Sequence, residues 1–286
     1  MMHRCTTLDG CRVSENRWRD EPPAPFRTEV GDQVGKQVWR AVVAGGAAAA
    51  FAAVAAAPAG AAEGGASFSR VQVNGGRPIV IGTTNEVMAP ASFRMTTTKQ
   101  GKWPAVFLYR SGGDRLWHAI ETDDCVKVGP GVCDITERMY FQPSEYDMRN
   151  SEAGAWKVGA EVYFKDGSGD SDDKGMTVHV QRNSRLTVNA SPEPVAKGRT
   201  ITVTGKVTRA NWETRKYAAY GGRHVSLQFK PSGSASYSTV KKVYADGSGN
   251  LKTTVKASKT GTWRWVYYGN TTTGASKSSG DNVVVK

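Results

Sequence analysis

The sequence has few of the residues, and none of the short motifs, by which most enzymes are recognised. It contains only 4 histidines, and no G-x-S-x-G, H-E-x-x-H or phosphate-binding glycine loop occurs along the chain. Leu and Glu are scarce, and no stretch shows a sustained helical period of apolar residues. A catalytic triad can still assemble from distant residues without a local signature. These absences argue against a helical fold, and we expect a protein that is not an enzyme and has no resident cofactor.

Long apolar runs are absent except for one near the start of the chain. Lys36 and Arg40 precede the run Ala41–Ala57, and small residues follow it. The run is shorter than the roughly 20 residues that a membrane-spanning helix needs. A charged region, an apolar region and a small-residue cleavage site are together typical of a secretory signal. We expect a signal peptide at 36–61 and a mature protein that is secreted, extracellular or envelope-associated, without a transmembrane anchor; an uncleaved anchor is the alternative.

The first 35 residues do not fit a signal peptide. They are polar, contain proline and carry charges of both signs. Our hypothesis is that 1–35 is an upstream extension from a start site assigned too early, with initiation near Val34. If so, Cys5 and Cys11 are not part of the protein.

Cysteine is otherwise confined to one pair. Cys125 and Cys133 flank a segment whose Gly129-Pro130-Gly131 is a turn signal. An even pair in an exported chain favours a disulfide. A redox-active pair would have C-x-x-C spacing beside a helix, which is not the case here. We therefore expect a structural disulfide that closes a hairpin.

The mature region contains a series of short expected strands. Apolar residues alternate with polar ones, and clusters of Gly, Pro, Asn and Asp bound each run. In the domain expected at 62–182 the clearest strand is Ala155–Asp166, where Trp156 and every second residue after it up to Phe164 are apolar, so one face should be buried. The other strands expected there are Arg70–Val73, Pro78–Thr83, Ala91–Thr98, Ala105–Arg110, His118–Val128, Val132–Phe141 and Met176–Arg182.

A second domain is expected at 183–286, after the short polar joint Asn183-Ser184. Four segments alternate with period two, and in the last of them Trp263, Trp265 and Tyr267 share one face. About seven short strands in roughly 100 residues is the count of an immunoglobulin-like sandwich, and a closed barrel is the alternative. The predicted fold class is all-β, with two tandem immunoglobulin-like β-sandwich domains after a signal peptide.

Several segments resemble a known family. They are RLTVNASPEPVAKGRTITVTGKVTRA from Arg185, NWETRKYAAYGG, SGNLKTTVKASKTGTWRWVYYG and the terminal SSGDNVVVK, with VNGGRPIVIGTTN and NSEAGAWKV in the first domain. Together they resemble secreted actinobacterial (Streptomyces-like) proteins built from tandem immunoglobulin-like domains. The resemblance covers nearly the whole mature chain and implies the fold and export. Some members of that family are labelled calcium-binding, which implies a calcium site to be sought among the acidic residues.

One acidic segment could bind calcium. Four carboxylates lie within eight residues, at Asp166, Asp170, Asp172 and Asp173, and Ca²⁺ takes six to eight oxygen ligands. The EF-hand order is not met, because position 12 counted from Asp170 is Gln181. We expect an acidic, solvated hairpin turn, with a calcium-stabilised loop as the alternative.

Tryptophan offers a second possible ligand site, for carbohydrate. Three tryptophans lie on apolar alternating faces and are expected in the cores: Trp156, Trp263 and Trp265. Three others lie beside Pro, Gly or charged residues and are candidates for a sugar-binding platform: Trp103, Trp117 and Trp212.

Charge is distributed unequally between the two expected domains. The first, at 62–182, has 14 Lys/Arg and 16 Asp/Glu, whereas the second, at 183–286, has 17 and 4, a net charge of +13. Five bases fall on the outward phase of the second domain's strands, and we expect several of them to share one solvent side: Lys206, Lys230, Lys252, Lys256 and Arg264.

The positive electrostatic field of the second domain attracts polyanions. We expect a secreted, monomeric, non-enzymatic binding or surface-structural module whose basic domain attaches to anionic cell-envelope polymers. Nucleic acid is less favoured, because export separates the domain from most of it. The alternatives are charges that serve solubility only, and a calcium- or carbohydrate-binding module in the first domain.

Overall fold

The structure of the chain, a computed structural model, describes residues 65–110, 115–118, 121–122, 125–144, 148–172 and 175–286. The expected extension at 1–35, the signal peptide at 36–61 and Asp173 lie outside these residues. Apart from two short 3-10 turns, the secondary structure of the described residues is all strand. None of the described segments is a helix long and apolar enough to cross a bilayer.

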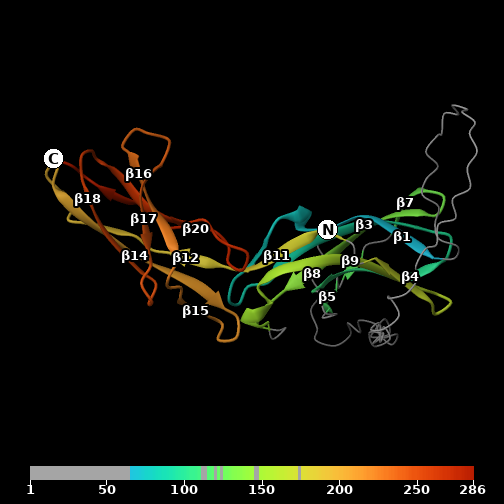
Figure 1. Cartoon of the computed structure of the whole chain (residues 1–286). Coiled ribbons are helices and arrows are strands. Elements are labelled where there is room, and N and C mark those ends of the chain that lie inside the picture. Colours follow the sequence, from blue (N-terminus) through green and yellow to red (C-terminus); the bar gives the residue numbers. More distant parts are fainter. Residues whose placement is uncertain (1–64, 111–114, 119–120, 123–124, 145–147, 173–174) are drawn as a thin grey trace, which may run out of the picture. The chain divides into compact units, whose positions relative to one another are not determined.

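The first sandwich consists of two sheets (Figure 1). One has the order β1 (Ala66–Val73), β3 (Val87–Thr97), β8 (Val132–Phe141), β6 (Glu121–Thr122), with β7 (Val126–Gly129) also pairing β8. The other has the order β2 (Ile79–Ile81), β11 (Thr177–Arg182), β9 (Gly154–Phe164), β4 (Gly101–Tyr109), β5 (Arg115–His118), with β10 (Gly169–Asp172) also pairing β9. The pair β2–β11 is parallel and the other pairs are antiparallel. β1 and β2 are the two halves of a first strand that is divided between the sheets, and β2 lies beside the last strand, β11. The two sheets then have the A-B-E-D and G-F-C-C′ strand orders of an immunoglobulin-like domain.

The second sandwich begins at Ser184, which the single residue Asn183 separates from the end of β11. One sheet has β14 (Thr200–Asn211) at its centre, paired with β12 (Ser184–Leu186), β13 (Asn189–Ser191), β15 (Lys216–Ala219) and β18 (Asn250–Lys256). The other has the order β17 (Ser238–Tyr244), β16 (His224–Pro231), β19 (Gly261–Tyr267), β20 (Ser276–Lys277), with β21 (Asp281–Val283) also pairing β19. The strands form two separate sheets rather than a closed barrel, so the predicted tandem immunoglobulin-like fold is confirmed.

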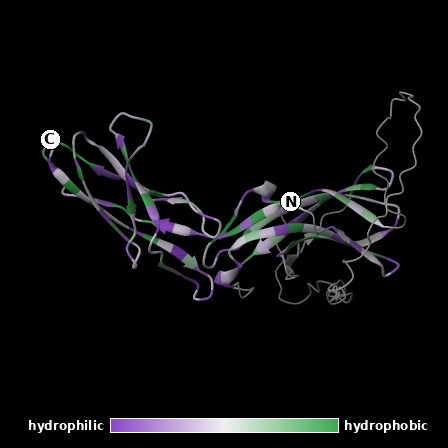
Figure 2. Cartoon of the chain, in the orientation of Figure 1, coloured by the Kyte–Doolittle hydropathy of each residue, from purple (hydrophilic) through white to green (hydrophobic). Residues whose placement is uncertain are grey.

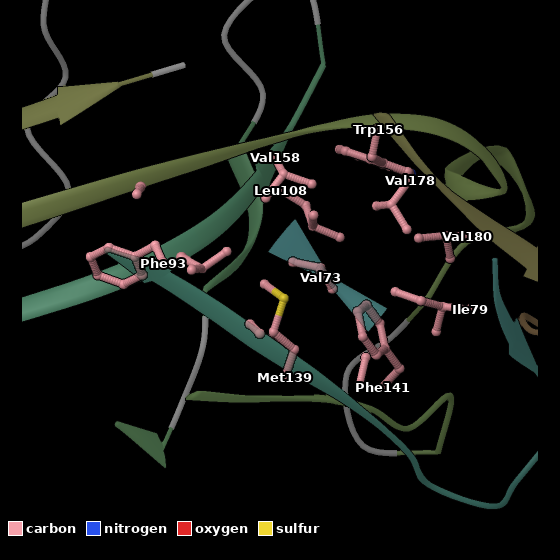
Figure 3. Packing of buried hydrophobic residues seen from close by; sticks show 14 of the residues in the cluster. Val73, Ile79, Phe93, Leu108, Met139, Phe141, Trp156, Val158, Val178 and Val180 are labelled. Carbon is pink, nitrogen blue, oxygen red and sulfur yellow. The ribbon is translucent and has the colours of Figure 1, made fainter. Parts of the chain in front are cut away.

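The cores follow from period-two alternation. Figure 2 shows hydrophobic and hydrophilic positions interspersed along the strands. In the first sandwich, Phe93 and Met139 of one sheet and Leu108 and Trp156 of the other point toward one another (Figure 3). In the second, Trp265 lies in a separate cluster with Trp263 and Tyr267, which share its face of the strand. Both tryptophans are buried, as predicted.

The structure differs from the expected strands in two places. The expected strand His118–Val128 is divided into β5, β6 and β7, since β5 pairs in one sheet while β6 and β7 pair in the other. Strand β10 was not expected, and it lies within the acidic segment. The face of β9 opposite Trp156 is also less exposed than expected: Glu161 and Gly159 are buried, and the ring of Phe107 lies against Gly159.

Candidate functional site

The five candidate bases lie on two opposite faces of the second sandwich. Lys206 on β14 and Lys252 and Lys256 on β18 are exposed on the outer face of the β14 sheet. Lys230 on β16 and Arg264 on β19 lie, partly buried, on the outer face of the β16 sheet. The expectation that the bases share one solvent side is therefore wrong, because the outer faces of the two sheets of a sandwich point away from each other.

We call the outer face of the β14 sheet, with Lys206, Lys252 and Lys256, the lysine face. Lys206 is opposite Asn250 in the register of β14 and β18, so Lys206 and Lys252 are diagonal neighbours at roughly 7–8 Å. None of the three lysines forms an ion pair within the described residues; the two ion pairs found there, Arg94–Asp134 and Lys99–Asp166, belong to the first sandwich. The lysine face therefore presents positive charge that no neighbouring carboxylate pairs.

One carboxylate does lie near the lysine face. Asp246 precedes β18, and its Oδ1 accepts hydrogen bonds from the backbone N–H groups of Ser248 and Asn250 at 2.9 and 2.8 Å. The bonds donated by Asn250 are the main reason that the pKa of Asp246 lies below its usual range, and the charge of Lys206 adds a smaller effect. Asp246 thus closes the turn at 246–250 that leads into β18.

The outer face of the β16 sheet carries a group of polar and aromatic side chains, which we call the tyrosine–arginine face: Gln228, Lys230, Tyr237, Tyr244, Arg264 and Tyr268. Arg264 Nε donates a hydrogen bond to Gln228 Oε1 at 2.9 Å, and Gln228 Nε2 donates to Tyr268 Oη at 3.3 Å. The Arg264 guanidinium carbon lies 3.6 Å from the centre of the Tyr237 ring, and Lys230 Nζ lies 5.3 Å from it. Sequence reasoning did not find this set.

Two tyrosines of this face are largely open to solvent. Tyr268 is 65% exposed and Tyr244 is 67% exposed. The His224 ring meets the Tyr244 ring edge-on, with centroids 3.6 Å apart. The sequence does indicate the exposure of Tyr268, because it has the outward phase of β19, whose inward phase holds Trp263 and Trp265. The tyrosines were not among the predicted aromatic platforms, all of which were tryptophans.

Of the three tryptophans that were candidates for a sugar platform, neither of the two whose side chains the structure describes is fully exposed. Trp212 is only 1% exposed; it belongs to the hydrophobic cluster of the first sandwich, and its indole N–H donates to the carbonyl of Ile81 at 3.3 Å. Trp212 is therefore ruled out as a candidate platform, since its polar neighbours in the sequence say nothing of what packs on it in space. Trp103 is partly buried. The side chain of Trp117 lies outside the described residues.

In the acidic segment, the carboxylates of Asp166 and Asp170 accept hydrogen bonds from other groups of the protein. Asp166 accepts hydrogen bonds from the N–H and hydroxyl of Ser168 at 2.9 and 2.6 Å, and Lys99 Nζ lies 3.1 Å from it. These contacts, led by the Ser168 hydroxyl, lower the pKa of Asp166 to about 2. Asp170 accepts from the backbone N–H of Ala66 at 2.9 Å, and Asp172 is partly buried at the end of β10. Within the described residues no three metal-ligating side chains come together.

The predicted disulfide is confirmed. Cys125 and Cys133 are bonded, with their Cα atoms 5.3 Å apart. Cys125 immediately precedes β7 and Cys133 lies in β8, which pairs β7 across the turn at Gly129-Pro130-Gly131. The bond therefore closes a hairpin at the edge of the first sandwich and brings no reactive group to a site.

Comparison with known proteins gives only distant similarity. No family model and no curated protein matches the chain. Among solved structures, it is similar to the fibronectin(III)-like modules of Clostridium thermocellum CbhA, with 11% identity over 75% of this chain and 92% of that chain and a TM-score of 0.29. It is also similar to three N-terminal domains of the outer capsid protein Hoc of bacteriophage RB49 (12%, 77% and 71%, TM-score 0.31) and to the Escherichia coli adhesin FdeC (18%, 80% and 66%, TM-score 0.28). Similarity at this level carries no argument about function.

Proposed function

We propose that this chain is an exported, non-enzymatic binding or surface module that attaches to an anionic polymer of the cell envelope through its second sandwich. The observation that carries the proposal is the surplus of 17 basic over 4 acidic residues at 183–286, together with outward bases that form no ion pair in the described part of the chain. The Cys125–Cys133 disulfide supports an oxidising compartment, as export would provide.

Attachment of this kind rests on the field of the whole domain. A sandwich with a net charge of +13 raises the local concentration of a polyanion and releases its counterions on binding. Because bases lie on both outer faces, a flexible polymer can contact the domain from more than one side. Affinity should then depend steeply on salt, since the screening length falls to about 4–5 Å at several hundred millimolar ionic strength.

The test is binding of the full chain to purified anionic wall polymer at low and at high salt. We expect retention at low ionic strength and elution as salt approaches several hundred millimolar. A variant with four bases of the second sandwich changed to Gln should bind more weakly, with a nearly unchanged melting curve because exposed charges contribute little to stability: Lys206, Lys252, Lys256 and Arg264.

The matched control changes four exposed bases of the first sandwich to Gln, with the same loss of charge: Lys127, Arg149, Lys157 and Lys165. It should lower affinity much less. Equal losses in the two variants, or binding that ignores salt, would show that the charge of the second sandwich serves solubility and that the attachment proposal is wrong.

A further inference from the structure

The side chains of the tyrosine–arginine face are held in place by hydrogen bonds, which attraction of a polyanion by net charge alone does not need. Arg264, Gln228 and Tyr268 are linked in series by hydrogen bonds of 2.9 and 3.3 Å. These side chains cross the outer face of β16 and β19, whose Gln228 and Arg264 are directly paired in the strand register. Side chains held in this way lose less conformational entropy when they bind a ligand than free surface side chains do.

The charge of this face is entirely positive. None of the strands β16, β17, β19 and β20 contains Asp or Glu. Besides Arg264 and Lys230, the register places Lys242 and Lys277 on the outward phase, opposite Ser226 and Val266. The acidic residue in the strands of this sheet, Asp281 on β21, accepts a hydrogen bond from the backbone N–H of Ala190 at 2.6 Å. An anionic ligand would therefore meet no opposing carboxylate on these four strands.

Arg264 is oriented for a planar anion. Its Nε donates to Gln228, and its guanidinium carbon lies over the Tyr237 ring, 3.6 Å from the ring centre. Within the described residues its two terminal nitrogens donate no hydrogen bond. A guanidinium fixed on one side and free on the other presents the two parallel N–H groups that match a carboxylate.

Exposed tyrosine rings supply the second recognition element. Tyr268 and Tyr244 are about two-thirds exposed on the same outer face, and Tyr268 is tethered through its hydroxyl to Gln228. An aromatic ring exposed at this level offers an apolar face beside a polar edge. Sugar rings have the complementary arrangement, with C–H groups on their faces and hydroxyls on their rims.

We propose that the tyrosine–arginine face binds an acidic polysaccharide whose sugar rings carry carboxylates. Sugar rings stack on Tyr268 and Tyr244, sugar hydroxyls bond to Gln228, and a carboxylate pairs with the terminal nitrogens of Arg264 with Lys230 nearby. A polyanion without sugar rings satisfies only the bases, and a neutral glycan satisfies only the rings and the amide. The inference rests on the proposed function, because it names the polymer class and the face that takes it.

The experiment compares three polymers with the full chain at moderate salt: polygalacturonate, poly-glutamate of similar charge density, and neutral dextran. We expect polygalacturonate to bind at least about tenfold more tightly than poly-glutamate, and dextran not to bind. Tyr268→Ser and Arg264→Gln should each lower polygalacturonate affinity about tenfold, the size of one charge-assisted or well-placed contact. Lys157→Gln, which removes the same charge as Arg264→Gln from an exposed position of the first sandwich, should change it less than about twofold.

A further variant distinguishes loss of recognition from misfolding of the chain. Arg264→Lys keeps the charge but loses the planar fork, so it should lose the preference for polygalacturonate while binding poly-glutamate as before. If the wild-type chain binds both acidic polymers alike, or if Tyr268→Ser with an unchanged melting curve keeps full affinity, the polysaccharide inference is wrong and charge-based attachment stands. If neither acidic polymer binds even at low salt, the proposed function fails as well.

Discussion

At the scale of single residues, burial distinguishes aromatic side chains that are close together in the sequence. Trp263 is 4% exposed and stacks at a tilt on Phe229, with ring centroids 4.4 Å apart. Tyr268, five residues later, has the opposite phase and lies open to solvent. Neighbouring aromatic residues on one segment therefore have different environments: Trp263 fills the core and Tyr268 is exposed on the surface.

This difference predicts unequal costs of truncation. Trp263→Ala should lower the free energy of unfolding by about 3–5 kcal/mol, because it leaves a large cavity in a packed interior, and the same holds for Trp156→Ala. Tyr268→Ala, the control, should change it by less than about 0.5 kcal/mol. Denaturant unfolding of the three variants measures both, and a Trp263→Ala chain that unfolds like the parent would contradict the assigned core.

At the scale of elements, the hairpin of β7 and β8 depends on its disulfide. All residues of β7 are exposed, so the hairpin has little apolar packing of its own. Cys125→Ser should leave the fold intact and lower stability by about 2–3 kcal/mol, the chain entropy that a loop this short restores to the unfolded state. Chemical denaturation measures the loss, and the Cys125→Ser/Cys133→Ser chain is the matched control. Two free thiols at Cys125 and Cys133 in the native protein would refute the pairing.

The acidic segment between β9 and β11 is where the alternative of a calcium site can be tested. Asp166 and Asp170 already accept hydrogen bonds from Ser168 and from the backbone of Ala66. We therefore expect millimolar Ca²⁺ to leave the melting temperature unchanged. A ligand specific for the folded state would raise it by mass action, so a clear rise that is lost in Asp170→Asn/Asp172→Asn would show that this loop binds calcium.

At the scale of the whole molecule, the chain is a pair of sandwiches of opposite electrostatic character. The residues 62–182 carry a net charge of −2 and the residues 183–286 a net charge of +13. In the first sandwich, Arg94 pairs with Asp134 and Lys99 with Asp166, whereas the candidate bases of the second have no such partners among the described residues. The salt-dependent attachment and its four-base variants test this property at the scale to which it belongs.

Much of this organisation follows from the sequence alone. Alternation with period two predicts which side chains of a strand enter the core, because successive side chains of any strand point to opposite faces; it placed Trp156, Trp263 and Trp265 correctly. Turn residues around short strands and an isolated cysteine pair likewise predict the all-β fold and the hairpin disulfide. The distribution of charge needs no structure at all.

What only the tertiary structure decided is which strands are neighbours. Alternation tells whether a side chain points inward or outward but not to which of two sheets its strand belongs, since that depends on pairing between strands far apart in the chain. Lys206 and Arg264 have the same outward phase, yet they lie on opposite faces because β14 and β19 belong to different sheets. For the same reason Trp212 is buried by a distant segment, and Gln228, Arg264 and Tyr268 become one face only when β16 and β19 pair.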